Sequence, residues 1–285
     1  MKSKQSNLWL LAALAAPAAH FSGCGWLSAL TTAAVILPLT LVKRDWSFTR
    51  PVALLQIIWL GIVAGSILPA SALCWPSDSD LTVPLTILTL AALTRADNAP
   101  RIGAVLAFAV GLLALPIAIS GAAHVEPGWL RPTPLTWEPM LALVLLLPAL
   151  PGTGGKKGRG ILAVGVLTAV LAALVQGVLH PAVAERIPDP EYQTARFLGY
   201  LEPVASAALT MGWYAMTTWL FFAAAEIAPK SQMGQRLPYV LLWGTAATAV
   251  AFKWQLPATF LTVLSTVLWC FAPIFQKMKK VKNSA

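Results

Sequence analysis

The chain has 285 residues, of which 58% are hydrophobic and only 11% are charged. Soluble domains carry about 25% charged residues, so this composition excludes an ordinary soluble domain and predicts an all-α integral membrane protein. The formal net charge of +9 comes from basic residues spread over many short segments, which excludes a single nucleic-acid-binding patch and indicates membrane topology instead.

Apolar runs separated by short polar turns predict ten transmembrane helices. They lie near 7–21, 24–42, 52–73, 80–94, 102–122, 136–151, 160–180, 200–226, 237–252 and 255–276. If the N-terminus is cytoplasmic, only four of the 20 Lys and Arg residues fall on the outer side, namely Arg131, Arg186, Arg196 and Lys253. This bias follows the positive-inside rule and predicts that both termini are cytoplasmic. Several spans are shorter than the roughly 20 residues of a straight crossing, so some are expected to be broken, re-entrant or buried.

Residues that loosen the backbone occupy the connection between the first two spans. Pro17, Gly23 and Gly25 surround the turn, and His20 lies beside them. A helix interrupted at membrane depth frees peptide groups that transporters use to hold ions and substrates. These four residues are therefore candidate substrate-binding positions. The alternative is that residues 21–25 form only a tight extracellular turn.

The third span carries small residues on one face. Gly61 and Gly65 lie four residues apart, and Ser66 follows Gly65 directly. Such residues let another helix approach closely, so this span is expected to pack tightly against a neighbour.

Glu138 stands just inside the start of the span at 136–151, after a Pro-rich segment at 123–137 that is not expected to form a regular helix. A carboxylate inside a membrane segment indicates a functional site. Glu138 is therefore a further candidate for substrate binding. The alternative places it at the membrane interface, where a charge costs little.

The span at 200–226 has two distinct faces. Its small residues, Ala205, Ala208, Gly212 and Ala215, predict close packing against another helix. Almost opposite them runs a stripe of hydroxyl side chains, Ser206, Thr210, Tyr214 and Thr217. Lipid chains cannot form hydrogen bonds with such a stripe, so Ser206, Thr210 and Tyr214 are predicted to line a solute site. The alternative is that Ser and Thr only bond the carbonyl four residues earlier in their own helix.

No pattern of catalytic or metal-binding residues occurs in the chain. His20, His124 and His180 lie in separate turns, and neither an H-E-x-x-H motif nor a pair of carboxylates accompanies them. The glycine-rich segment GTGGKKGRG lacks the spacing of a phosphate-binding loop. We therefore expect neither an enzyme activity nor a cofactor.

Three stretches resemble the B-subunit permeases of spore germinant receptors (the GerAB type), which belong to the amino acid–polyamine–organocation transporter superfamily. GWLSALTTAAVILPL at 25–39 looks like the opening of the family's second span, and TWEPMLALVLLLPAL at 136–150 is similar to its sixth. Residues 190–226 resemble the eighth span, with an Arg-bearing lead-in, a Leu-Glu pair, a mid-helix Trp and an alanine-rich end. The order of these motifs along nearly the whole chain carries the resemblance.

The resemblance implies one polytopic membrane domain over residues 1–285, built as a 5+5 inverted-repeat (LeuT-like) bundle. Residues 1–122 would form the first five-helix repeat, 136–276 the second, and 277–285 a basic cytoplasmic tail. It further implies a multi-pass protein of the bacterial inner membrane, or more specifically of the spore inner membrane. Its expected partners are lipids and the other subunits of a germinant receptor.

The expected function is to bind, sense or transport a small solute, such as an amino acid or similar nutrient, without a nucleic-acid partner. The rival hypothesis is a non-transporting membrane scaffold derived from a permease, which would have no polar cavity.

Overall fold

In the computed structural model, every regular element among the described residues is a helix, and these residues contain no strand. The structure describes residues 9, 12–13, 16–17, 25–41, 50–75, 80–94, 98–133, 135, 157–187, 190–228, 236–254, 256–257, 260–261, 263–265 and 267. This architecture confirms the all-α class that the composition predicts.

The helices follow the predicted spans closely. In chain order they are α2 (Trp26–Leu41), α3 (Arg50–Ile67) with the 3-10 helix η2 (Leu68–Ala72), α4 (Thr82–Leu93), α5 (Ala99–Ala122), the 3-10 turn η3 (Pro127–Trp129), α7 (Lys157–Leu179), α8 (Pro181–Ala184), α9 (Pro190–Phe197), α10 (Glu202–Ile227) and α11 (Leu237–Ala251). The Pro-rich segment at 123–137 forms no long helix in its described part. The span predicted at 136–151 lies outside the described residues.

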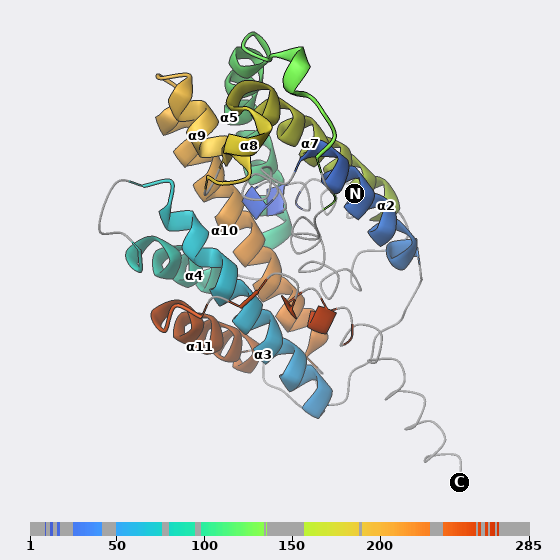
Figure 1. The fold of residues 1–285 in the computed structure, drawn as a ribbon. Coiled ribbons are helices and arrows are strands. Elements are labelled where there is room, and N and C mark those ends of the chain that lie inside the picture. The colour runs from blue at the N-terminus through green and yellow to red at the C-terminus, as the bar shows by residue number, and fades with distance from the viewer. Residues whose placement is uncertain are drawn as a thin grey trace.

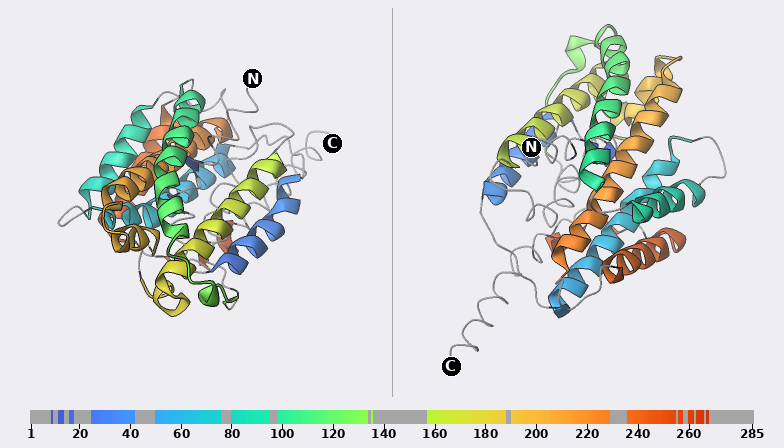
Figure 2. Two further views of the ribbon diagram at one scale, coloured as in Figure 1. Left: turned by 90° about the horizontal axis from the view of Figure 1, so that it is seen from above. Right: turned by 180° about the vertical axis from the view of Figure 1, so that it is seen from behind.

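Helix α10 is the centre of the fold (Figure 1). It packs against α3, α4 and α11 on one side and against α5 on the other, while α2 and α7 lie side by side farther away (Figures 1 and 2). Pro203 stands in its first turn, where the missing N–H costs no hydrogen bond. Buried side chains occur around its whole circumference, so both of its faces meet protein, as the sequence predicts.

The small-residue face of α10 brings the start of the chain against it. A Cβ added at Gly212 would lie 2.8 Å from the Cβ of Ala16 and 3.0 Å from its backbone nitrogen. Close by in the sequence, the indole N–H of Trp9 donates to the carbonyl of Ala215 at 3.3 Å. The predicted close packing along this face is confirmed at Gly212.

The small-residue face of α3 packs against α11. A Cβ added at Gly65 would lie 2.6 Å from the carbonyl oxygen of Ala246 and 2.5 Å from the Cβ of Ala249. One turn earlier, a Cβ added at Gly61 would collide with the hydroxyl oxygen of Thr245. The absence of side chains at these two positions therefore sets how closely α3 and α11 approach.

Two stretches of the described residues are long and apolar enough to cross a membrane. Arg50–Ala72 has a mean hydropathy of 2.1, and Arg101–Ala122 has one of 2.6. They differ in their surroundings, because 56% of the apolar stretch is buried in the first and only 17% in the second. The outer face of α5 carries large apolar side chains that are 55% to 75% exposed, namely Val105, Phe108, Leu112, Leu115 and Ile119.

Candidate solute-binding site

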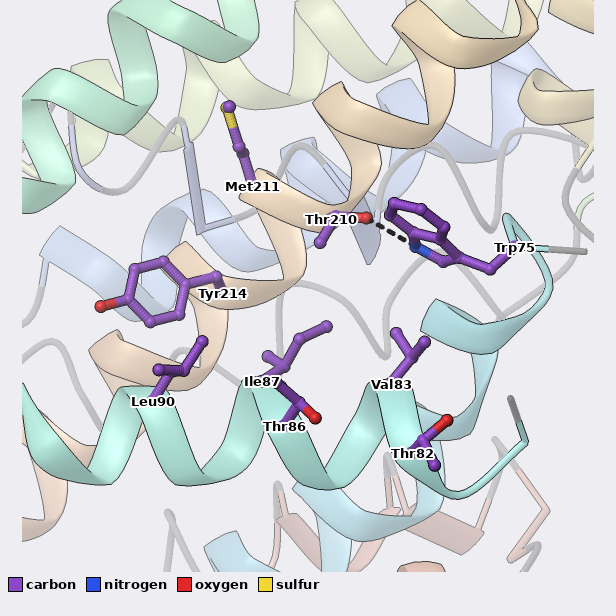
Figure 3. Close-up of a pocket in the computed structure, with 9 residues that line it drawn as sticks. All are labelled: Trp75, Thr82, Val83, Thr86, Ile87, Leu90, Thr210, Met211 and Tyr214. Carbon is purple, nitrogen blue, oxygen red and sulfur yellow. Dashed lines mark hydrogen bonds between the residues drawn. The ribbon is translucent and has the colours of Figure 1, made fainter. Parts of the chain in front are cut away.

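A pocket with a volume of about 430 Å³ lies between α4 and α10. This volume falls within the range of roughly 300–1,000 Å³ that is typical of small-molecule sites. Figure 3 shows its lining side chains, which come from α4, from α10 and from the turn after η2. They are Trp75, Thr82, Val83, Thr86, Ile87, Leu90, Thr210, Met211 and Tyr214.

Thr210 fixes the position of Trp75 at one end of the pocket. The hydroxyl of Thr210 donates to the carbonyl of Ser206 at 2.7 Å, one turn earlier in α10. The same oxygen accepts a hydrogen bond from the indole N–H of Trp75 at 3.0 Å (Figure 3). Because a hydroxyl has one proton and two lone pairs, Thr210 keeps one acceptor position for a ligand and has no proton left to donate.

Tyr214 stands at the opposite end of the pocket (Figure 3), and its hydroxyl joins α10 to the end of α4. Its hydroxyl lies 2.7 Å from the hydroxyl oxygen of Thr94. Thr94 donates its own proton to the carbonyl of Leu90 at 3.1 Å, since a carbonyl oxygen can only accept. The proton between the two hydroxyls therefore comes from Tyr214, whose oxygen remains an acceptor.

The α4 wall is mostly apolar. Val83, Ile87 and Leu90 point toward α10 (Figure 3), and Met211 of α10 adds a further apolar side chain to the lining. Thr86 is exposed on this wall and makes no hydrogen bond to any other described residue. Its hydroxyl is therefore available both to donate to a ligand and to accept from one.

None of the nine described lining residues carries a formal charge. Asp80, two residues before Thr82, pairs with Lys253 at 3.3 Å, and both side chains of this pair are largely exposed. In the part of the chain that the structure describes, no group of three or more His, Cys, Asp or Glu residues is placed to hold a metal ion.

The structure separates the hydroxyl stripe that the sequence predicts. Thr210 and Tyr214 line the pocket, whereas Ser206 is buried and donates to the carbonyl of Cys74 at 2.8 Å. Thr217 is also buried and donates to the carbonyl of Trp213 at 2.8 Å, four residues earlier. Ser206, Thr210 and Thr217 each donate to the carbonyl four residues earlier, as the alternative interpretation predicts. Thr210 nevertheless lines the pocket together with Tyr214.

The candidate residues from the start of the chain lie elsewhere, as far as the structure describes them. Pro17 is buried in a helical position, and Gly25 is buried at the start of α2. Neither lines the pocket between α4 and α10. His20, Gly23 and Glu138 lie outside the described residues.

Gly25 meets a polar side chain that the sequence analysis does not single out. Its φ of +87° favours glycine, and an added Cβ would collide with Thr133 and lie 3.2 Å from the amide nitrogen of Gln176. Gln176 is fully buried on α7, and neither polar atom of its amide has a hydrogen-bond partner among the described residues. The sequence could have indicated Gln176, because a polar amide inside an apolar span is unusual.

Seven of the nine described lining residues were not predicted as site residues, and three of these seven carry a polar group. Thr82 and Thr86 lie one turn apart on α4, and Trp75 precedes that helix. The sequence could have indicated the two threonines, because their four-residue spacing places both on one helix face.

A second polar contact outside the pocket joins α9 to the start of α10. Tyr192 is buried, and its hydroxyl donates to the carboxylate of Glu202. Burial, and next the bond to Glu202, raise the pKa of Tyr192 from 10.0 to about 12. The folded chain therefore holds this proton more tightly than the unfolded chain does.

We expect Tyr192 to make folding pH-dependent only at high pH. Because its folded pKa lies above its unfolded value, its stabilising contribution is complete below about pH 10 and is lost as the pH rises toward 12. An ultraviolet titration of the tyrosines in wild-type protein and Tyr192→Phe measures this directly. The component lost in the variant should titrate near pH 12, and Tyr200→Phe, at an exposed tyrosine, should leave it unchanged. A lost component that titrates near pH 10 would contradict the buried contact.

A scan of the chain against protein-family models gives no match, and a search of the curated proteins gives none either. The geometry of the pocket and the sequence pattern are therefore the grounds for assigning a function.

Proposed function

We propose that this chain is a multi-pass, permease-like membrane protein that binds a small solute in the pocket between α4 and α10. The binding would serve to sense or transport the solute. The observation that carries the proposal is the pocket itself, with two hydroxyl groups of α10 among its apolar walls.

The exposed face of α5 supports placement in a membrane. A soluble monomer rarely leaves a contiguous apolar patch larger than a few hundred Å² in water. The core helix of a soluble protein can be as apolar as α5, but it is buried, whereas only 17% of the apolar stretch of α5 is. Lipid chains would cover Phe108 and its neighbours along this face. Other helices expose large apolar side chains as well, among them Leu55, Leu93 and Val240.

The position of the hydroxyl groups supports solute binding. Thr210 and Tyr214 lie in the middle third of the 26 residues of α10, so they would sit near the centre of the membrane if α10 crosses it. A polar group at that depth is costly unless it has a partner or a function. Both residues line the pocket, and the hydroxyl oxygen of each keeps acceptor capacity.

The remaining sequence-based expectations belong to the same proposal. They are the ten-span topology with cytoplasmic termini, the 5+5 repeat, an amino acid or similar nutrient as solute, and partner subunits of a germinant receptor. The distribution of basic residues supports the topology, and the order of the three family-like motifs supports the rest.

Ligand-dependent stability tests the proposal. A ligand that binds only the folded state at about 100 times its Kd stabilises it by about 2.7 kcal/mol. Thermal unfolding of the detergent-solubilised protein would be measured across amino acids, sugars and neutral nutrients. We expect at least one compound to raise the unfolding temperature of the wild-type protein.

Variants decide whether such a compound occupies this pocket. Leu90→Trp fills the pocket and should abolish the shift, while Thr210→Val should reduce it. Thr248→Val is the matched control, because Thr248 donates to the carbonyl four residues earlier, at 2.7 Å, as Thr210 does, but lies exposed on α11. A shift that survives Leu90→Trp, or no shift across the whole panel with folded protein, would favour the scaffold hypothesis.

A further inference from the structure

We infer that the pocket between α4 and α10 selects an uncharged solute with an apolar body and a hydrogen-bond donor, such as an alcohol or a primary amide. This inference rests on the proposed function, since it specifies the ligand of the same site. It departs from a zwitterionic amino acid as the solute.

The described lining of the pocket carries no charge, which favours an uncharged solute. A carboxylate or an ammonium group that leaves water needs an opposite charge or several directed hydrogen bonds. The nine lining residues supply no ionised side chain. A zwitterion would require compensation for both of its charges, whereas a neutral molecule requires none.

The directions of the hydrogen bonds on the α10 wall favour a solute that donates a hydrogen bond. The N–H of Trp75 is used by Thr210, the proton of Thr210 by the carbonyl of Ser206, and the proton of Tyr214 by Thr94. The α10 wall therefore presents oxygen lone pairs and no free proton. A carboxylate, which only accepts, would find no donor on the α10 wall and only the single hydroxyl of Thr86 on the α4 wall, whereas a ligand O–H or N–H can bond either α10 oxygen.

The apolar walls favour a solute with an apolar body. Val83, Ile87, Leu90 and Met211 line the pocket together with the rings of Trp75 and Tyr214. An apolar body gains from leaving water against such side chains. An ammonium ion can also approach aromatic faces, but no carboxylate among the lining residues offsets its loss of hydration, so the neutral donor is favoured.

A matched set of probes that share one phenyl-bearing body tests this inference. The set consists of phenethyl alcohol, phenethyl methyl ether, ethylbenzene, phenethylamine, phenylacetate and phenylalanine. Binding to the full-length protein would be measured by equilibrium dialysis, which gives the free probe concentration despite partition into detergent. We expect the alcohol to bind roughly tenfold more tightly than the ether, which can only accept, and more tightly than every charged probe.

The variants connect this preference to the pocket. Thr210→Val should weaken binding of the alcohol several-fold and leave the ether unchanged. Leu90→Trp should abolish binding of both, and Thr248→Val should change neither.

Each contrary outcome overturns a distinct statement. Tighter binding of a charged probe that Leu90→Trp abolishes would overturn the neutral class and leave the solute site standing. Equal binding of alcohol, ether and ethylbenzene would overturn the donor requirement. If Leu90→Trp affects the binding of no probe, the solute site fails, and the ligand class fails with it.

Discussion

Replacing Trp219 by alanine is expected to lower the free energy of unfolding by about 3–5 kcal/mol, the usual cost of deleting a large buried aromatic side chain. Trp219 is only 1% exposed and belongs to the largest fully buried side chains of the described core. Its ring meets that of Trp9 edge to face, with 4.6 Å between the ring centres. Alanine would leave a cavity between α10 and the start of the chain.

Two further variants define the origin of this loss. Within the part of the chain that the structure describes, the indole nitrogen of Trp219 has no hydrogen-bond partner. Trp219→Phe therefore removes ring volume but no such hydrogen bond and should cost less than half as much. Trp243→Ala removes the same side chain from α11 at a position that is 40% exposed, and should cost about 1 kcal/mol or less. Chemical unfolding in micelles measures all three. Equal losses at Trp219 and Trp243 would show that Trp219 is not in the core.

The second large effect is expected at the contact between α3 and α11. Gly65→Ala should destabilise the protein by about 2–3 kcal/mol, because the new methyl group must displace a neighbouring backbone. The carbonyl of Ala246, 2.6 Å from the added Cβ, belongs to the backbone of α11 and cannot rotate away. The two helices must therefore move apart.

Gly111→Ala is the matched control for this substitution. Gly111 also lies inside a helix, α5, but no atom of the described residues lies within 4 Å of an added Cβ there. Alanine is a better helix former than glycine by about 1 kcal/mol, so this variant should be neutral or slightly more stable. The opposite signs of the two changes are the diagnostic result, and a destabilisation of equal size at both glycines would contradict the close approach of α3 and α11.

Much of the fold was predictable because apolar runs and small-residue spacings are local properties of the sequence. The boundaries of α10 (Glu202–Ile227) agree with the predicted span at 200–226, and the glycines of α3 and α10 lie at close helix contacts. In each case the signal depends on residues within a few turns of one another. Which helix each glycine meets was not predictable, because the partner lies far away in the sequence.

The candidate site was predictable only in part, for a geometric reason. Residues four apart on a helix with 3.6 residues per turn drift by about 40°, so a stripe that starts at Ser206 turns away by the time it reaches Tyr214. Ser206 therefore faces Cys74, while Thr210 and Tyr214 face α4. The hydrogen-bond partners of Thr210 and Tyr214, which are Trp75 and Thr94, lie 135 and 120 residues away from them in the sequence.

Lipid exposure of α5 is the claim on which both membrane embedding and a pocket at membrane depth depend. The most direct measurement places nitroxide spin labels, one at a time, along α5 of a cysteine-free variant in liposomes. Positions 108, 112 and 115 sample the exposed face, while 110 and 117 sample the buried one. Their accessibility to oxygen, which dissolves in lipid, is compared with that to a polar nickel chelate. We predict high oxygen and low nickel accessibility on the exposed face. Nickel accessibility there equal to that of a label at Glu126, in the exposed segment after α5, would show that α5 faces water and would contradict a membrane protein.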